Sequence, residues 1–107
     1  MVTRESVISN LKMFAGEMKQ SGFHLNKMVL YGSYSRNQQH TFSDIDVAII
    51  ADEFTGIGFD DVMLISRLLS KHPKLNSIQP RTYNTNDFTP DKDPFVEEIL
   101  KTGIDIV

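Results

Sequence analysis

The run from Asp44 to Ile50 constrains the fold of this chain more than any other stretch. Apart from its two aspartates the run is apolar, which is the pattern of a strand buried on both faces in the middle of a sheet. A buried strand does not tolerate an unpaired charge. Asp44 and Asp46 must therefore lie at the exposed end of the strand, and their spacing of two residues puts both side chains on the same face.

This pair of carboxylates predicts a metal site at the mouth of the strand. Two neighbouring carboxylates repel each other, and a divalent cation between them allows both to stay ionised. The alternative is a solvated strand end, where Asp44 and Asp46 have no role beyond solubility. The rest of the sequence has to decide between the two interpretations.

A second apolar strand, expected over residues 27–31, ends abruptly in Gly32 and Ser33. Such an ending lets the backbone turn sharply and present N–H groups, together with the Ser33 hydroxyl, to an anion. The alternative is an ordinary helix cap, with Ser33 capping a short helix through Arg36. The position of the turn just ahead of the two aspartates favours the anion site. A phosphate cradle beside a carboxylate pair predicts metal-assisted phosphoryl or nucleotidyl transfer.

Two short motifs together resemble a known signature. They are Gly32-Ser33-x-x-Arg36 and, after a short spacer, Ser43-Asp44-Ile45-Asp46-Val47. The signature is the Gly-Ser-x-x-Arg-Gly…Ser-Asp-x-Asp pattern of the DNA polymerase β-like nucleotidyltransferase superfamily. In its small size the chain resembles the minimal nucleotidyltransferase branch of this superfamily. Many members of that branch are antitoxins paired with HEPN-domain toxins. The resemblance implies an α/β (α+β) fold with helices packed on a mixed β-sheet. We expect Ser43 to shape the turn ahead of the aspartates.

The resemblance also implies roles for the motif residues. Gly32 and Ser33 are implied to hold the triphosphate of an NTP, with ATP as the expected substrate, and Asp44 and Asp46 to bind two Mg²⁺ (or Mn²⁺) ions. One ion would clamp the phosphates and stabilise the leaving pyrophosphate, and the other would lower the pKa of the attacking hydroxyl. Arg36 is implied to lie near the phosphates, although a salt bridge to an acidic neighbour explains it equally well.

The sequence departs from the family pattern in two places. Asn37 stands where a glycine usually follows the arginine, and asparagine tolerates a positive φ better than most residues. Gln79 stands where the superfamily has a third carboxylate, so the expected metal ligands are Asp44, Asp46 and Gln79. A glutamine lends a carbonyl oxygen to a metal but no charge, which predicts weaker metal binding and weaker activation of the nucleophile.

Hydrophobic periodicity gives the order of the remaining elements. It predicts a core helix over residues 4–20 with Gly22 after its end. It also predicts a second helix, whose core face consists of Phe59, Val62, Ile65, Leu68 and Leu69. We expect Asp60 and Asp61 to complement the dipole of that second helix from its first turn.

The last third of the chain predicts three further elements. A strand over residues 77–83 contains Pro80, which favours an edge position because proline has no backbone N–H. A short helix follows, with Asp93 as cap, Pro94 at the first helical position and an apolar face that includes Leu100. Residues 104–107 predict a last short strand.

Bulk properties bound the architecture and the compartment. The 107 residues predict a single domain, 1–107, large enough to bury about two thirds of its unfolded surface. There is no cysteine, and no apolar run approaches the ~20 residues of a membrane span. The N-terminal residues have no apolar core of a signal peptide. We therefore expect a cytoplasmic protein with no membrane contact.

The charge balance bears on the partners. The net charge is −3, and no segment concentrates lysine and arginine, so nucleic acid is not expected as the main partner. Two functional classes stay open. The chain either transfers a nucleoside monophosphate, AMP in the first place, to a hydroxyl on a partner such as a HEPN-type protein, or it is a weak or inactive relative that neutralises a partner by binding it. A homo-oligomer is the alternative to a different partner.

Overall fold

The computed structural model describes residues 3–39 and 44–107. Its elements, in chain order, are α1 (Arg4–Gln20), β1 (Leu25–Tyr31), β2 (Ile45–Ala51), α2 (Gly58–Leu69), the 3-10 turn η1 (Pro73–Leu75), β3 (Ile78–Asn84), α3 (Phe95–Thr102) and β4 (Ile104–Asp105). This order of helices and strands is the one that the sequence predicts. The fold class is confirmed as a mixed sheet with helices packed on it.

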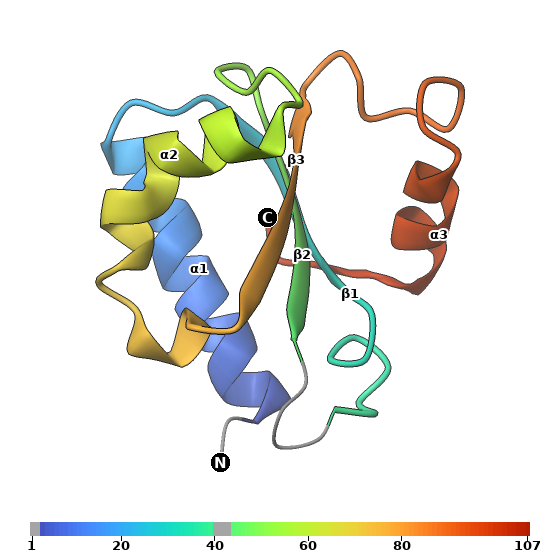
Figure 1. The fold of residues 1–107 in the computed structure, drawn as a ribbon. Helices are drawn as coiled ribbons and strands as arrows, with labels where there is room; N and C mark the ends of the chain where they lie inside the picture. Colours follow the sequence, from blue (N-terminus) through green and yellow to red (C-terminus); the bar gives the residue numbers. More distant parts are fainter. Residues whose placement is uncertain (1–2, 40–43) are drawn as a thin grey trace.

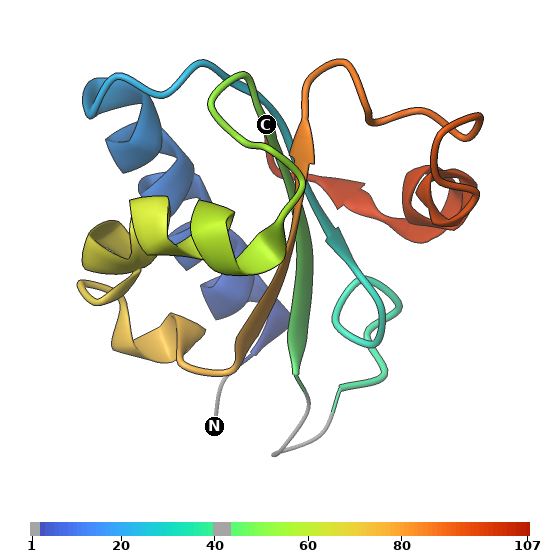
Figure 2. The same cartoon turned by 45° about the horizontal axis from the view of Figure 1, so that its top comes forward.

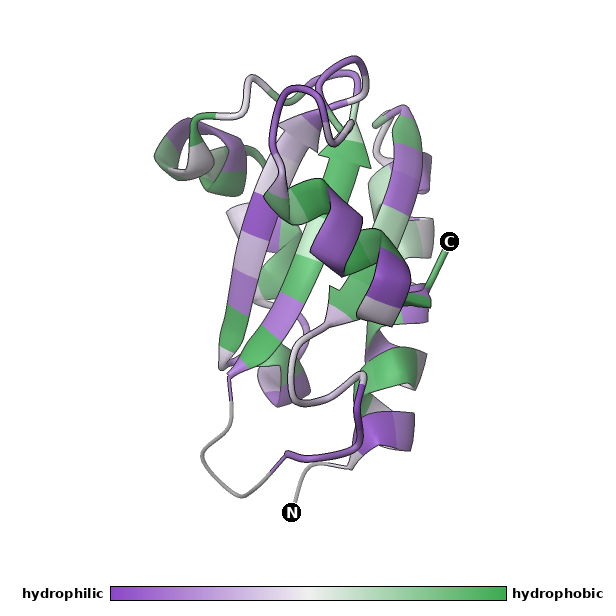
Figure 3. Cartoon of the chain, turned by 90° about the vertical axis from the view of Figure 1, so that its right-hand side faces the viewer, coloured by the Kyte–Doolittle hydropathy of each residue, from purple (hydrophilic) through white to green (hydrophobic). Residues whose placement is uncertain are grey.

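The four strands lie in the order β3-β2-β1-β4. β2 is antiparallel to β1 and parallel to β3, while β4 adds to the other side of β1. The prediction that the apolar run forms a central strand is confirmed, since only Asp46 in β2 is not fully buried. Figure 3 shows the contrast between the hydrophobic central strand and the more hydrophilic edge strand β3.

Pro80 lies in an edge strand, as expected. The Ile45 N–H donates to the Ser77 carbonyl across the β2–β3 ladder at 2.9 Å. Backbone groups of alternate residues along a strand point to opposite sides, so the backbone of Pro80 faces away from β2. The missing N–H of Pro80 therefore leaves no gap in the ladder, and it interrupts the exposed edge that another strand would pair with.

The helices divide between the two faces of the sheet, with α1 and α2 on one face and α3 on the other (Figure 1). The turned view in Figure 2 shows the same separation. Sixteen buried residues form the core under α1 and α2, whereas six form the core under α3. The smaller core covers only part of its face, and the partly exposed Asp46 and the exposed Gln79 lie on that side. None of the described helices has the length and apolar character that crossing a bilayer requires.

Helix α1 has the predicted bounds, and its local chemistry explains them. Thr3 caps the helix, with its hydroxyl accepting from the Ser6 N–H and the Ser6 hydroxyl accepting from the Thr3 N–H, both at 3.1 Å. This reciprocal pair satisfies two N–H groups that a helix start leaves without partners. The chain leaves the helix through Gly22, whose φ of 98° is in the region that favours glycine.

Helix α2 buries most of its predicted face, with Ile65 in the core and Leu68 and Leu69 packed against it, but Phe59 departs from the prediction. Phe59, expected in the core, is 78% exposed, whereas Asp61 and Ile65 are fully buried. Residues four apart share a face of a helix, so Asp61 and Ile65 point together at the sheet and Phe59 lies on another side. Leu100 in α3 is likewise 48% exposed, because Val96 and Ile99 form the buried face of that helix.

Asp61 ties the β2–α2 loop to the sheet. Its carboxylate accepts hydrogen bonds from the Thr55 N–H at 2.8 Å, the Thr55 hydroxyl at 3.1 Å, the Gly56 N–H at 2.9 Å and the Thr82 hydroxyl at 2.7 Å. Burial raises the pKa of Asp61, but these hydrogen bonds together outweigh burial and hold the pKa below its usual range. The sequence predicted Asp61 in the first turn of the helix. It did not predict these hydrogen bonds, because they form only when the β2–α2 loop is folded.

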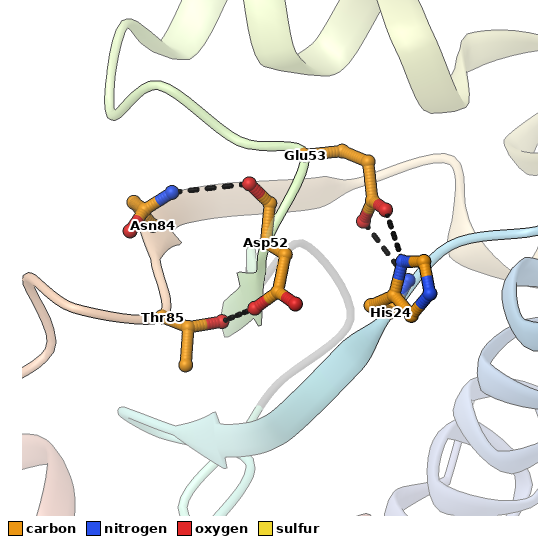
Figure 4. Close-up of polar contacts among 5 residues, drawn as sticks. All are labelled: His24, Asp52, Glu53, Asn84 and Thr85. Carbon is orange, nitrogen blue, oxygen red and sulfur yellow. Dashed lines mark hydrogen bonds and ion pairs between the residues drawn. The ribbon is translucent and has the colours of Figure 1, made fainter.

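Polar contacts also fix the strand ends at the side of the sheet remote from Asp44 (Figure 4). Glu53 accepts from the backbone N–H of His24 at 2.9 Å and contacts the His24 ring at 2.6 Å. The hydrogen bond to Glu53 raises the pKa of His24. The Asn84 amide donates to the Asp52 carbonyl at 3.1 Å, and the Thr85 hydroxyl donates to the Asp52 carboxylate. The ends of β2 and β3 are thereby joined to each other, and β2 to the start of β1.

Replacing Asp61 by alanine should destabilise the protein by roughly 2–4 kcal/mol, because buried N–H and O–H donors lose their acceptor. Because folding lowers the pKa of Asp61, its stabilisation is present above the usual value of 3.8 and is lost as the pH falls through the folded-state pKa. Urea denaturation at several pH values measures both effects. Asp60→Ala is the matched control, since Asp60 is exposed in the same turn. Equal losses for the two variants would contradict the role of Asp61.

Candidate functional site

The segment after β1 is a tight turn anchored in the core. Residues 32–37 form consecutive turns without a helix, so the expected alternative of a short helix capped by Ser33 is not adopted. The Arg36 N–H donates to the Gly32 carbonyl at 3.3 Å, and the Gln38 N–H donates to the Ser33 carbonyl at 2.8 Å. The Tyr34 side chain is buried in the core. The turn is therefore held in one direction by both backbone bonds and packing.

Gly32 allows this turn and also makes room for Asp46. Its φ is 74°, in the left-handed region that L side chains rarely adopt. A Cβ at this position would lie 2.3 Å from Oδ2 of Asp46, so any larger residue would displace that carboxylate. Asn37 has a φ of 55°, which confirms that the asparagine in place of the family's glycine keeps the left-handed backbone of the turn.

Asp44 and Asp46 lie where the sequence places them, at the start of the central strand. Asp44 is exposed just before β2, and Asp46 is partly buried within it. Burial raises the pKa of Asp46, the Asp44 carboxylate raises it further, and the Arg36 guanidinium lowers it. The two carboxylates therefore repel each other, as expected for a same-face pair.

Gln79 is the neighbour of Asp46 on the parallel strand β3, and Tyr31 is its neighbour on β1. Residues paired across a ladder put their side chains on the same face, so Gln79 extends beside Asp46. The structure thus places Gln79 beside Asp46, as the sequence predicted. Among residues 3–39 and 44–107, no group of three or more histidine, cysteine, aspartate or glutamate side chains is arranged to hold a metal.

The donor set at this end of the sheet is nonetheless suitable for a hard divalent cation. Asp44 and Asp46 offer carboxylate oxygens and Gln79 an amide oxygen, which are ligands that Mg²⁺ and Mn²⁺ accept. A cation would also relieve the repulsion that raises the pKa of Asp46. The set carries one negative charge less than three carboxylates would.

Arg36 is exposed on the turn, and its Nε donates to Oε1 of Gln38 at 3.1 Å. Its charge reaches Asp46, because it lowers the pKa of that carboxyl. Within the part of the chain that the structure describes, the ion pairs do not include Arg36, so the salt-bridge explanation gains no support there. The prediction for Ser43 lies outside the described residues.

Arg81 is two residues after Gln79 in β3 and shares its face, but the sequence did not predict the contacts that hold it. Arg81 donates from Nε to the Tyr83 hydroxyl at 2.8 Å and from Nη2 to the Asp93 carboxylate at 3.3 Å. The three residues line part of a cavity of about 290 Å³. The alternation of Arg81 and Tyr83 after Gln79 is the only sequence signal for this arrangement, since the partner Asp93 comes from a later loop.

Comparison with known proteins identifies the class. The profile of the family described as "Polymerase beta, Nucleotidyltransferase" matches residues 17–107. The chain therefore belongs to the polymerase β-like nucleotidyltransferases, and the mixed sheet described above is the fold of that family. Members of this family typically use a divalent metal ion.

A solved structure agrees with this assignment. The crystal structure of a "putative nucleotidyltransferase" from Sulfolobus solfataricus has a TM-score of 0.63 to this chain and 16% sequence identity. The match covers 95% of this chain and 80% of that chain. The TM-score shows a shared fold, and at this identity the likeness is one of fold alone. No curated protein matches the sequence.

Mg²⁺ or Mn²⁺ should raise the melting temperature, because a ligand that binds the folded state stabilises it by mass action. At a hundredfold excess over Kd the gain is about 2.7 kcal/mol, and each kcal/mol corresponds to roughly 4–8 °C for a domain of this size. Asp44→Asn with Asp46→Asn should abolish the rise. Asp60→Asn with Asp91→Asn, which removes two exposed carboxylates elsewhere, should keep it. Thermal denaturation with and without Mn²⁺ tests this, and an equal rise in the first double variant would place the metal elsewhere.

Proposed function

We propose that this protein is a Mg²⁺-dependent enzyme of the minimal nucleotidyltransferase branch, which transfers AMP from ATP to a hydroxyl group on a partner protein. The observation that carries the proposal is the contact between the Gly32 turn and Asp46, which brings an anion-binding backbone and a carboxylate pair to one end of the sheet. Family membership supports a nucleotide as the substrate.

The residues of this chain would divide the reaction between them. Gly32 and Ser33 would hold the triphosphate through the N–H groups of the turn and the Ser33 hydroxyl. Asp44, Asp46 and Gln79 would hold the metal ions. When bound, these ions supply positive charge to the phosphates and lower the pKa of the attacking hydroxyl. The hydroxyl oxygen would form a bond to the α-phosphorus and lose its proton to solvent while the bond to pyrophosphate breaks.

Rigidity of the turn supports this assignment. The Ser35 hydroxyl donates to the Gly32 carbonyl at 2.8 Å, and Nη1 of Arg4 donates to the Ser35 carbonyl at 3.4 Å. These bonds and the buried Tyr34 fix the backbone before a ligand arrives. A preorganised site loses less conformational freedom when the nucleotide binds.

An exposed apolar surface supports a macromolecular partner. Large apolar side chains on and beside α2 are exposed, namely Ile57 (59%), Phe59 (78%), Met63 (62%) and Leu64 (53%). Soluble proteins rarely expose such groups together unless the surface binds another protein or a membrane. The proposed occupant is a HEPN-type protein or, as the alternative, a second copy of this chain.

A second function is favoured by one observation, the glutamine at position 79. With Gln79 beside Asp46, the site carries less negative charge than a carboxylate triad, and activation of the acceptor hydroxyl would be weaker. The chain would then neutralise its partner by binding it, with little or no transfer of nucleotide.

Transfer of labelled AMP from ATP to the co-purified partner separates the two functions. Gln79→Asp or Gln79→Glu should increase transfer by about tenfold or more, since each ~1.4 kcal/mol of transition-state stabilisation is a factor of ten. Gln20→Glu makes the same kind of substitution at an exposed position at the end of α1 and should leave transfer unchanged. Asp44→Asn with Asp46→Asn should abolish it.

Two outcomes would contradict this expectation. Robust transfer by the wild type without a gain from either Gln79 variant would show that Gln79 does not occupy the position of a third carboxylate. No transfer by any variant, together with tight binding of the partner by all of them, would establish the binding function instead.

A further inference from the structure

Arg81 projects from the same face of the sheet as the carboxylate pair. It is paired with Ala48 across the β2–β3 ladder, as Gln79 is paired with Asp46. Paired residues and residues two apart in a strand share a face. Arg81 therefore lies in the row next to Asp46 and Gln79, about 7 Å further along the strand.

Two ring contacts and one strand pairing also connect Arg81 to Asp46 across the surface of the sheet. Tyr31 is the ladder neighbour of Asp46 on β1. The Tyr31 ring meets the Phe95 ring edge-on with a centroid distance of 5.7 Å. The Phe95 ring in turn lies 4.8 Å from Cζ of Arg81. Arg81 and Tyr31 therefore both contact Phe95, and Tyr31 is the ladder neighbour of Asp46.

The guanidinium of Arg81 is held in place but keeps free hydrogen-bonding capacity. Tyr83 and Asp93 engage its Nε and Nη2, and Asp93 is fixed by the Tyr83 hydroxyl at 2.7 Å and by the Phe95 N–H at 3.0 Å. These contacts use two of its five N–H donors. The side chain is 49% exposed, so the remaining donors are accessible to a ligand.

The space beside Arg81 can admit a ligand. Arg81 lines the cavity of about 290 Å³, whose other lining residues include Gly56, Gly58 and Pro80. The lining also includes two carboxylates, Asp87, which is paired with Lys92, and Asp93, which is paired with Arg81. A nucleotide held at Asp46 would extend along the strand toward this cavity, and Arg81 would lie between the two.

We propose that Arg81 binds the phosphate group of the nucleotide at the Asp44 and Asp46 site, an inference that rests on the proposed function. A guanidinium presents its N–H groups in a planar fork that matches two oxygens of one phosphate. The Tyr83 hydroxyl and Asp93 occupy the Nε–Nη2 edge of the guanidinium, which leaves the Nη1–Nη2 edge for a phosphate. Gln79, two residues before Arg81 on the same face, adds no negative charge, so the carboxylate paired with Arg81 is that of Asp93.

A purely structural role is the alternative. In that case Arg81 would only hold Asp93 at the start of α3, and its replacement would lower stability without changing affinity for any ligand. The two roles differ in what they predict for phosphate compounds that lack a nucleoside.

Binding of Mg·ATP and of Mg·tripolyphosphate, measured by isothermal titration calorimetry, tests the proposal. Arg81→Gln should weaken both affinities by about tenfold or more, as expected for loss of charged hydrogen bonds. Arg81→Lys keeps the charge but not the planar fork, so its affinities should lie between those of the wild type and Arg81→Gln. It also replaces Arg81→Gln in the test if that variant does not fold. Lys101→Gln removes an exposed charge from α3 and should leave both affinities unchanged. Tm values for all variants report structural effects separately.

The proposal is overturned if Arg81→Gln binds both compounds as tightly as the wild type, whatever its Tm. It is also overturned if only Mg·ATP binding weakens, because the contact would then be with the nucleoside. If Asp44→Asn with Asp46→Asn loses binding while both Arg81 variants keep it, the inference fails and the proposed function stands. Absence of binding of either compound to the wild type overturns both.

Discussion

The close approach of Gly32 to Asp46 is the constraint on which the rest of the site depends. The Asp46 carboxylate occupies the space that a Cβ of residue 32 would take, and the positive φ of Gly32 turns the chain back over the sheet. Tyr34 then enters the core, which fixes the direction of the turn. A residue other than glycine would move the backbone N–H groups and the carboxylate at the same time.

Two aspartates show how the environment of a carboxylate sets the direction of its pKa shift. Asp61 is buried among four hydrogen-bond donor groups, and its pKa is lowered. Asp46 is partly buried beside Asp44, and its pKa is raised. The first carboxylate is already satisfied by the fold, whereas the second is stabilised only when positive charge is added. The two carboxylates also lie on different faces of the sheet. Asp61 lies on the face with the larger core, under α1 and α2, and Asp46 lies on the opposite face with α3.

Much of the fold was predictable because the sequence encodes it locally. The bounds of α1, the central position of β2, the edge position of Pro80 and the left-handed backbone at Asn37 each follow from residue type and spacing. The exposure of Phe59 was not predictable, because it depends on Asp61 being the residue that points at the sheet. The Arg81 network was missed for a similar reason, since Asp93 meets Arg81 only when the β3–α3 loop folds back.

The position of the bound metal tests the account most directly. Crystals grown with Mn²⁺ and a non-hydrolysable ATP analogue would locate the metal by its anomalous scattering and the phosphates by their density. The account predicts Mn²⁺ bound by oxygens of Asp44 and Asp46, with the phosphates against the turn at Gly32 and Ser33. Mn²⁺ bound away from both aspartates, or an ordered analogue whose phosphates do not contact that turn, would contradict it.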